Sequence, residues 1–171
     1  MGKIYKLHSA NIYMDNTNYA QVAEEITLPE VKYKTTTHAP TALSGSVDIP
    51  LVREPMSITI KGDFDPAFIA AASDTKHTHS LQIYSDLVEF EGGKGRAAES
   101  QVVAFLKVTF TGQKIDPFKH GEVAKVEYTA SVWAYKLAIE GVVEYDFDIT
   151  SNKDEVMGFD LNATQNEILA T

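Results

Sequence analysis

The chain has 171 residues, 44% of them hydrophobic and 23% charged, which is typical of one folded domain and excludes a wholly disordered polypeptide. Its net charge of -9, from 24 acidic and 15 basic residues, disfavours binding to nucleic-acid phosphates or to anionic membranes. It contains no cysteine, which excludes disulfides, thiolate metal sites and cysteine-based catalysis.

The first predicted element is a hairpin. Residues 11–14 (NIYM) and 19–22 (YAQV) flank residues 15–18 (DNTN), whose Asp and Asn side chains favour a turn. Residues 35–46 (TTTHAPTALSGS) come next, and they are rich in Thr, Ser, Pro and Gly with little to bury. This composition predicts a long mobile loop, which either has a function of its own or becomes ordered on binding a partner.

Two strands and a helix are predicted after this loop. Residues 47–51 and 56–61 alternate apolar and polar side chains, so each predicts a strand with one face toward a core. A short helix is predicted over about 65–73, because Asp65 can cap it and Pro66 suits its first turn. The inward positions of the two strands are Val47, Ile49, Leu51, Met56, Ile58 and Ile60.

Residues 101–111 and 126–134 carry the strongest strand pattern. Phe105 and Trp133 fall on their polar faces, which fits either a strand buried on both sides by ordinary packing or, as we expect, contact with a second copy of the chain. The Gly-rich residues 91–100 predict another mobile loop. The apolar faces consist of Val102, Ala104, Leu106, Val108 and Phe110 on the first strand, and of Val126, Tyr128, Ala130, Val132 and Ala134 on the second.

Together these elements predict a mainly β protein, a β-barrel or sandwich of antiparallel strands with one short helix and long loops that contact other subunits. We expect a single domain over residues 1–171 with its core at about 11–149. The C-terminal segment, residues 150–171, is expected to be helical or to form contacts, since residues 160–169 carry a weaker helical pattern.

No motif for catalysis emerges from the sequence. Residues 92–96 (GGKGR) lack the residue order of a phosphate-binding loop. Asp146 and Asp148 point to the same side of a strand, as a glycosidase carboxylate pair could, but a solvent-exposed acidic strand has the same pattern. His77 and His79 could form a pair of metal ligands, but no spacing identifies a third and a fourth. We therefore expect no enzyme, metal or cofactor. The sequence also lacks a secretory signal and a membrane-spanning apolar run, so we expect a soluble protein made in the cytoplasm.

Several short motifs, in the same order, resemble the major tail tube protein family of contractile-tailed bacteriophages. Residues 11–15 (NIYMD), 19–20 (YA) and 25–31 (EITLPEV) are similar to the start of that family, "NLFVDG…YAG…EITLPKL". Residues 134–141 (AYKLAIEG) are similar to its "YYKLEVDG", and residues 144–148 (EYDFD) to its "YEID". The likeness extends over about residues 11–148.

The resemblance implies a β-barrel-like subunit that forms hexameric rings. The rings stack head to tail into the inner tail tube, around a tape-measure protein and inside a contractile sheath, with baseplate and tail-terminator proteins at its ends. DNA, or ions in the related phage-tail-like bacteriocins, passes through the lumen without specific binding. The resemblance also implies that the protein belongs to the virion tail, which is assembled in the host bacterial cytoplasm without contact with a membrane.

Two sets of site residues follow as expectations. The loop expected to reach the next ring contains Thr35, Thr36, Thr37, His38, Ala39, Pro40, Leu43 and Gly45. The strand positions expected to face the lumen or a subunit boundary are Ser57, Thr59, Lys61, Lys107, Thr109, Glu127, Thr129 and Ser131. If the lumen repels DNA by charge, carboxylates must outnumber Lys61 and Lys107 on that face.

Three other functions stay open. The nearest is the tube protein of the type VI secretion machine, which is also a hexameric β-barrel. A non-viral carbohydrate-binding β-sandwich belongs to another class, and it would stay monomeric with a row of exposed aromatic side chains. An enzyme comes third because the catalytic motifs are missing.

Overall fold

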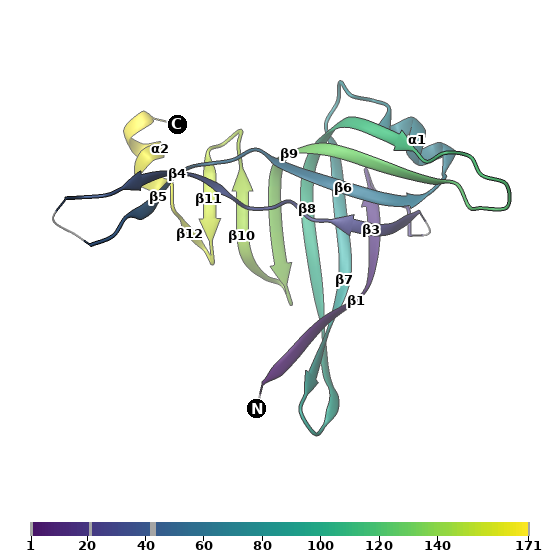
Figure 1. Ribbon diagram of the computed structural model, residues 1–171, viewed down its shortest axis with the longest axis horizontal. Helices are drawn as coiled ribbons and strands as arrows, with labels where there is room; N and C mark the ends of the chain where they lie inside the picture. Colours follow the sequence, from purple (N-terminus) through teal and green to yellow (C-terminus); the bar gives the residue numbers. More distant parts are fainter. Residues whose placement is uncertain (1, 21, 42–43, 171) are drawn as a thin grey trace.

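The computed structural model describes residues 2–20, 22–41 and 44–170, and most of its backbone is β strand (Figure 1). The predicted mainly β fold is confirmed, and a second short helix lies inside residues 160–169. The helices are α1 (Pro66–Ala72) and α2 (Ala163–Leu169). The strands are β1 (Lys3–Met14), β2 (Thr17–Asn18), β3 (Ala23–Thr27), β4 (Tyr33–His38), β5 (Val47–Arg53), β6 (Met56–Asp63), β7 (His79–Glu91), β8 (Gly95–Ile115), β9 (Lys125–Ile139), β10 (Val142–Asp148), β11 (Lys153–Val156) and β12 (Phe159–Asp160).

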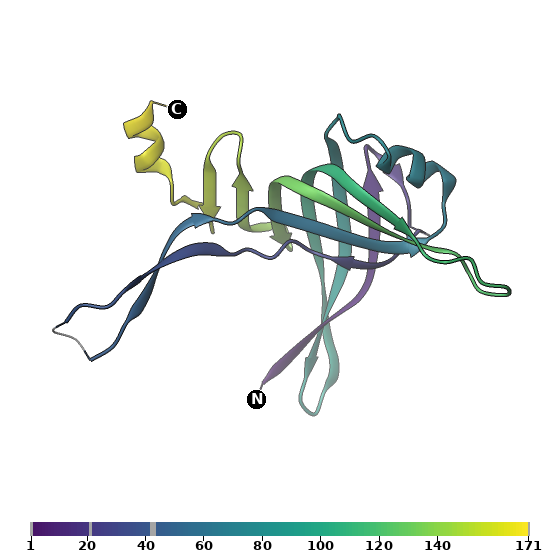
Figure 2. The same ribbon diagram turned by 45° about the horizontal axis from the view of Figure 1, so that its top comes forward.

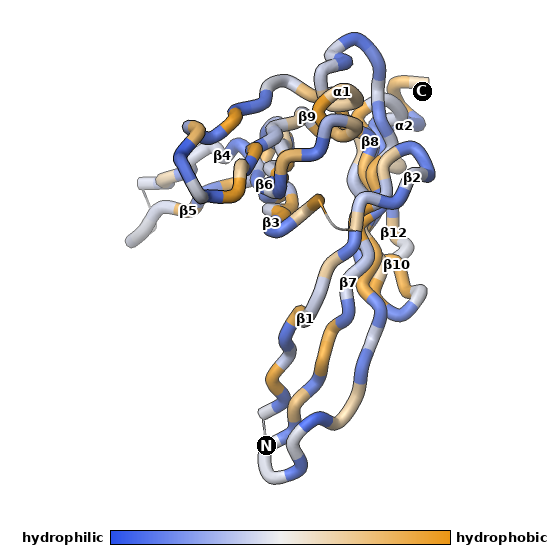
Figure 3. The backbone as a smooth tube through the Cα atoms, turned by 90° about the vertical axis from the view of Figure 1, so that its right-hand side faces the viewer, coloured by the Kyte–Doolittle hydropathy of each residue, from blue (hydrophilic) through white to orange (hydrophobic). Residues whose placement is uncertain are grey.

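Within the described residues, ten strands form one antiparallel sheet, and β4 and β5 form a separate two-stranded sheet. The main path of the large sheet runs β12, β11, β10, β9, β8, β7, β1, β2. The sheet divides at β9, because residues 125–132 pair with β6 and the later residues pair with β10. β3 pairs with β6, and these two strands leave the main layer (Figure 3). The result is sandwich-like: among the described residues, no pairing of β3 with β1 closes a barrel.

A β-bulge at Trp133 marks the point of division. The pairing of β9 with β8 passes from Val132 to Ala134, and Trp133 has no partner in the described ladder. An extra residue bends its strand and reverses the alternation of its side chains. Ala134, which was predicted to face the core, is therefore only half-buried, whereas Tyr135 is buried.

The core lies between the two layers and against α1. The predicted inward positions of β6, Met56, Ile58 and Ile60, are all buried. Phe68 of α1 is fully buried, and its ring meets the rings of Tyr19 and Tyr128 at centroid distances of 4.9 and 4.6 Å. The predicted apolar faces of residues 101–111 and 126–132 are likewise turned inward. The alternation of apolar and polar residues along the predicted strands therefore located most of the core correctly.

Helix α1 begins where the sequence predicted. The Asp65 carboxylate accepts hydrogen bonds from the backbone N–H groups of Ala67 and Phe68, at 2.9 and 3.1 Å, and Pro66 occupies the first turn. These contacts satisfy donors that a helix start leaves free. Among the described residues, no helix combines the length and the apolar character needed to cross a bilayer.

We expect the Asp65→Ala variant to lower the free energy of unfolding by about 1 kcal/mol, because it removes both cap hydrogen bonds. Urea denaturation followed by circular dichroism measures this change. Asp65→Asn is the matched control, since its side-chain oxygen still accepts both bonds and should retain most of the stability. Equal losses in the two variants would contradict a capping role.

The first hairpin is narrower than predicted. Asp15 and Asn16 alone form its turn, both with positive φ, and β2 comprises only Thr17 and Asn18. Asp and Asn tolerate this left-handed conformation better than most residues, which is why a tight turn forms here. The prediction of a second strand over residues 19–22 is wrong for residues 19, 20 and 22, and residue 21 lies outside the described residues.

Both predicted mobile loops contain residues of paired strands. Thr35, Thr36, Thr37 and His38 belong to β4 and pair with β5, so the prediction of a loop over residues 35–46 is wrong for this part. Threonine suits a paired strand as well as a loop, because its β-branched side chain fits a pleated surface. In residues 91–100, β7 ends at Glu91 and β8 begins at Gly95, so a continuous hairpin replaces the loop.

Candidate subunit interfaces

The side chains predicted for the lumen lie together on one surface. They project from β6, β9 and β8 away from the core, and each is exposed or half-buried. Ser57, Thr59 and Lys61 stand opposite residues 131, 129 and 127 of β9. We call this surface the hydroxyl face, and it consists of Ser57, Thr59, Lys61, Lys107, Thr109, Glu127, Thr129 and Ser131. The sequence therefore located one continuous face, because alternation determines on which side of a strand each residue lies.

The hydroxyl face has no excess of carboxylates. Lys61 Nζ lies 4.0 Å from Glu127. On the neighbouring strands, Glu25 of β3 is the cross-strand partner of Lys61, and Lys114 of β8 is the cross-strand partner of Glu127. Lys107 is a further cation on this face. The condition for repulsion of DNA by charge, that carboxylates outnumber lysines on this face, is therefore not met by its eight residues, since Lys61 and Lys107 are accompanied by Glu127 alone.

Trp133 adds an aromatic edge to the hydroxyl face. Its side chain is 45% exposed, and its indole N–H donates to Thr109 Oγ1 at 2.9 Å. Phe105 also lies on the outward side, half-buried, with the ammonium of Lys136 5.8 Å from its ring centroid. Both aromatic residues are thus on the side that the sequence assigned to contacts, and their contact with a second copy stays a prediction.

Strands β4 and β5 form a hairpin that projects from the body of the molecule (Figure 2). We call residues 33–53 the projecting hairpin. Its described members of the predicted inter-ring set are exposed, apart from the half-buried Pro40, and Leu43 lies outside the described residues. Thr37 Oγ1 donates to Asp48 across the hairpin at 2.7 Å.

The apolar side of the projecting hairpin is uncovered. Val47, Ile49 and Leu51 were predicted to face a core, but their side chains are 60%, 43% and 62% exposed. The prediction failed because β5 pairs only with β4 in the described sheets and lies outside the sandwich. Exposed apolar stripes of this kind mark contacts with other molecules.

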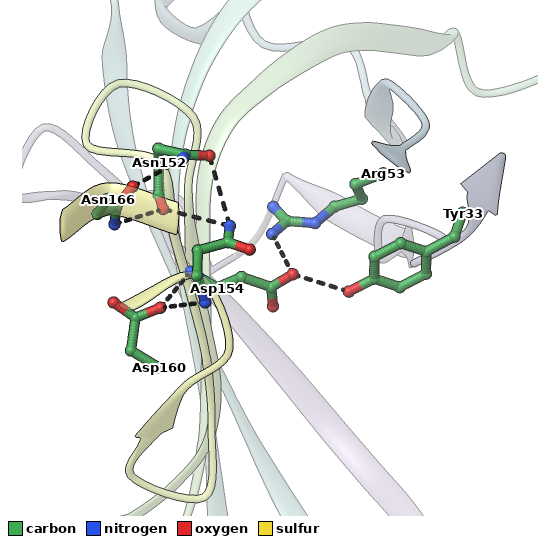
Figure 4. Close-up of polar contacts among 7 residues, drawn as sticks. Tyr33, Arg53, Asn152, Asp154, Asp160 and Asn166 are labelled. Carbon is green, nitrogen blue, oxygen red and sulfur yellow. Dashed lines mark hydrogen bonds and ion pairs between the residues drawn. The ribbon is translucent and has the colours of Figure 1, made fainter. Parts of the chain in front are cut away.

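The base of the projecting hairpin is fixed to β11 by polar contacts that the sequence did not reveal (Figure 4). Tyr33 and Arg53 are cross-strand partners, and both bind Asp154, whose carboxylate Oδ2 lies 3.0 Å from the Tyr33 hydroxyl and 3.1 Å from the guanidinium. The same guanidinium lies 4.0 Å from the centroid of the Phe147 ring. Burial and the hydrogen bond to Asp154 raise the pKa of Tyr33, so its hydroxyl stays protonated and donates.

The candidate chemical sites do not assemble. His79 Nδ1 lies 2.7 Å from Asp15 and His77 Nδ1 lies 2.8 Å from Asp74, whose Oδ2 is also 4.0 Å from His79 Nε2. Asp146 is bound by Lys153 at 2.9 Å. In the part of the chain that the structure describes, no group of three or more His, Asp or Glu residues could hold a metal ion.

The model of the family described as phage tail tube protein FII matches residues 4–169. The chain belongs to this family. The match covers both strands of the projecting hairpin, the hydroxyl face and the C-terminal segment, so the resemblance seen in the short motifs is confirmed. The chain is therefore a structural tail tube protein. A search of curated proteins found no match.

Several solved structures of contractile injection systems are similar to this phage tail tube family member. One is the sheath/tube terminator of the extracellular contractile injection system PVC, with 10% identity and a TM-score of 0.56 over 77% of this chain and 94% of that chain. The PVC sheath-tube complex gives 11% identity and a TM-score of 0.54 over 76% and 88%. The tube-terminating cap of the anti-feeding prophage is 12% identical, with a TM-score of 0.57 over 75% of this chain and 87% of that chain. At these identities the likeness establishes the fold.

Proposed function

We propose that this tail tube protein forms hexameric rings that stack head to tail into the inner tube of a contractile tail. The tube conducts DNA from the capsid to the host cell. A contractile sheath surrounds it, a tape-measure protein occupies it during assembly, and baseplate and tail-terminator proteins bind its ends. The role is mechanical and not catalytic, and assembly takes place in the bacterial cytoplasm.

The uncovered apolar stripe of the projecting hairpin carries this proposal. Val47, Ile49 and Leu51 leave large apolar areas in water on a segment that has no core of its own. A second copy of the chain is the partner that a repeating tube supplies at every position. The two ends of the molecule carry different projections, the β4–β5 hairpin at one and the β8–β9 hairpin at the other (Figure 2), so a contact between opposite ends joins unlike surfaces, runs head to tail and continues as a filament.

The hydroxyl face suits the wall of a channel through which DNA moves. Ser57, Thr59 and Thr129 offer small polar groups, while the charge of Lys61 is offset by Glu127 4.0 Å away. Binding to phosphates requires clustered cations, whereas Lys61 and Lys107 of this face belong to two strands, β6 and β8, that lie on either side of β9. DNA is thus kept from adhering because the lysines of this face do not form a cluster, and not because the wall repels it.

Negative-stain electron microscopy of the concentrated protein, combined with light scattering, tests the proposal. We expect hollow tubes or six-fold rings whose mass rises with concentration. A protein that stays monomeric at every concentration, both alone and with the tail baseplate present to initiate assembly, would contradict it.

A further inference from the structure

The C-terminal segment contacts the base of the projecting hairpin through Asp154. Tyr33 is the first residue of β4 and Arg53 the last of β5, so both strands of the hairpin reach the same Asp154 carboxylate. Asp154 lies on β11, 121 positions after Tyr33. The contact therefore joins the hairpin to the C-terminal end of the large sheet.

This contact resists rotation of the hairpin. Asp154 is only 5% exposed, and a carboxylate removed from water needs a cation and hydrogen-bond donors beside it. Arg53 supplies the cation and also stacks on Phe147 of β10. Turning the hairpin away from β11 would separate these groups and leave a buried charge unpaired, so one orientation is strongly favoured.

Strand β11 is itself held in place by the rest of the C-terminal segment (Figure 4). The Asp160 carboxylate accepts from the backbone N–H of Asn162 at 2.9 Å, and the backbone N–H of Leu161 donates to the Asp154 carbonyl at 2.7 Å. Asn152 and Asn166 exchange bonds, with Asn152 Nδ2 donating to Asn166 Oδ1 at 2.8 Å and Asn166 Nδ2 donating to the Asn152 carbonyl at 3.2 Å. Through these bonds β11, β12 and α2 form one unit.

We infer that residues 150–170 position the projecting hairpin for contact with the next copy of the chain, and that Asp154 is the positioning residue. The inference rests on the proposed function, since it assigns a role to the segment that presents the hairpin. A hairpin held in its binding orientation loses less conformational entropy when it docks, which favours stacking. The apolar stripe of β5 then meets its partner already aligned.

The orientation of the hairpin can be measured on the free subunit. Because the chain has no native cysteine, Ser46→Cys and Ser131→Cys introduce a unique pair of spin labels, one on the hairpin and one on β9. We expect a narrow distribution of label-to-label distances in the parent and a broad one in Asp154→Asn. Tyr33→Phe, which removes one hydrogen bond and no charge, should broaden it less.

Asp146→Asn is the matched control, because it removes a carboxylate of the same sheet that binds Lys153 on the outward side. It should leave the distance distribution unchanged. Without labels, Asp154→Asn should require about tenfold more protein to form tubes, which corresponds to about 1.4 kcal/mol. A narrow distribution in folded Asp154→Asn or Tyr33→Phe would overturn the inference, whereas a parent that never forms tubes would count against the proposed function alone.

Discussion

The Gly62→Ala variant is expected to be less stable than the parent protein by about 3 kcal/mol, the upper end of the range for overpacked interiors. Gly62 lies on β6 beside the chain that enters β3, and a Cβ atom at this position would overlap the carbonyl oxygen of Val22. That carbonyl accepts a hydrogen bond from the N–H of Asp63 at 2.9 Å. Backbone atoms cannot rotate aside as a side chain can, so the two strands must separate.

Gly112→Ala provides the matched control for this prediction. A Cβ atom there meets nothing within 4 Å, and its backbone lies outside the positive-φ region. We expect its free energy of unfolding to stay within about 0.5 kcal/mol of the parent value. Urea denaturation of both variants measures the difference, and similar losses in the two would show that the approach of β3 to β6 is looser than described here.

A double variant, Ile49→Glu with Leu51→Glu, is expected to fold normally and to lose tube formation. Both side chains are already exposed in the subunit, so the free energy of unfolding should change by less than about 0.5 kcal/mol. Burying each apolar side chain between copies contributes about 1.5 kcal/mol or more, so losing both raises the concentration needed for assembly by more than about a hundredfold.

Sedimentation and electron microscopy of this variant measure its assembly. The control exchanges the two residues, Ile49→Leu with Leu51→Ile, which keeps the apolar area and should keep the tubes. If the glutamate variant assembles like the parent, the projecting hairpin does not form the contact between rings.

The sequence predicted those parts of the fold that depend on neighbouring residues. Every second residue of β6 faces the core because a strand alternates by its own geometry, and Met56, Ile58 and Ile60 show this directly. The start of α1 was predictable for a similar reason, since Asp65 binds N–H groups only two and three residues away. Such local contacts leave a pattern that a single chain displays.

Features that depend on distant residues left no such pattern. The bulge at Trp133 can be predicted only when the pairing of β9 with β8 is known. The alternation of apolar and polar residues in the sequence therefore placed Ala134 on the wrong side of the strand. The stripe of Val47 and Ile49 has the pattern of a core strand although the sandwich does not cover it. The alternation of apolar and polar residues indicates that one face of a strand is apolar, but it does not specify which molecule covers that face.

The candidate sites likewise include one that the sequence predicted and one that it did not. The hydroxyl face was predictable as a set of positions because its members alternate with buried residues on three strands. The contact of Tyr33 and Arg53 with Asp154 was not predictable, since no local spacing links residues more than a hundred positions apart. That the hydroxyl face lines the lumen and that the hairpin contacts the next ring stay predictions.

Electron cryo-microscopy of assembled tubes, with helical reconstruction, tests the central claim most directly. The predicted result is a ring of six subunits with Thr59 and Thr129 facing the axis and the projecting hairpin of each subunit packed against the adjacent ring. A map in which the hydroxyl face lies on the outer wall, or in which the hairpin ends in solvent, would contradict it.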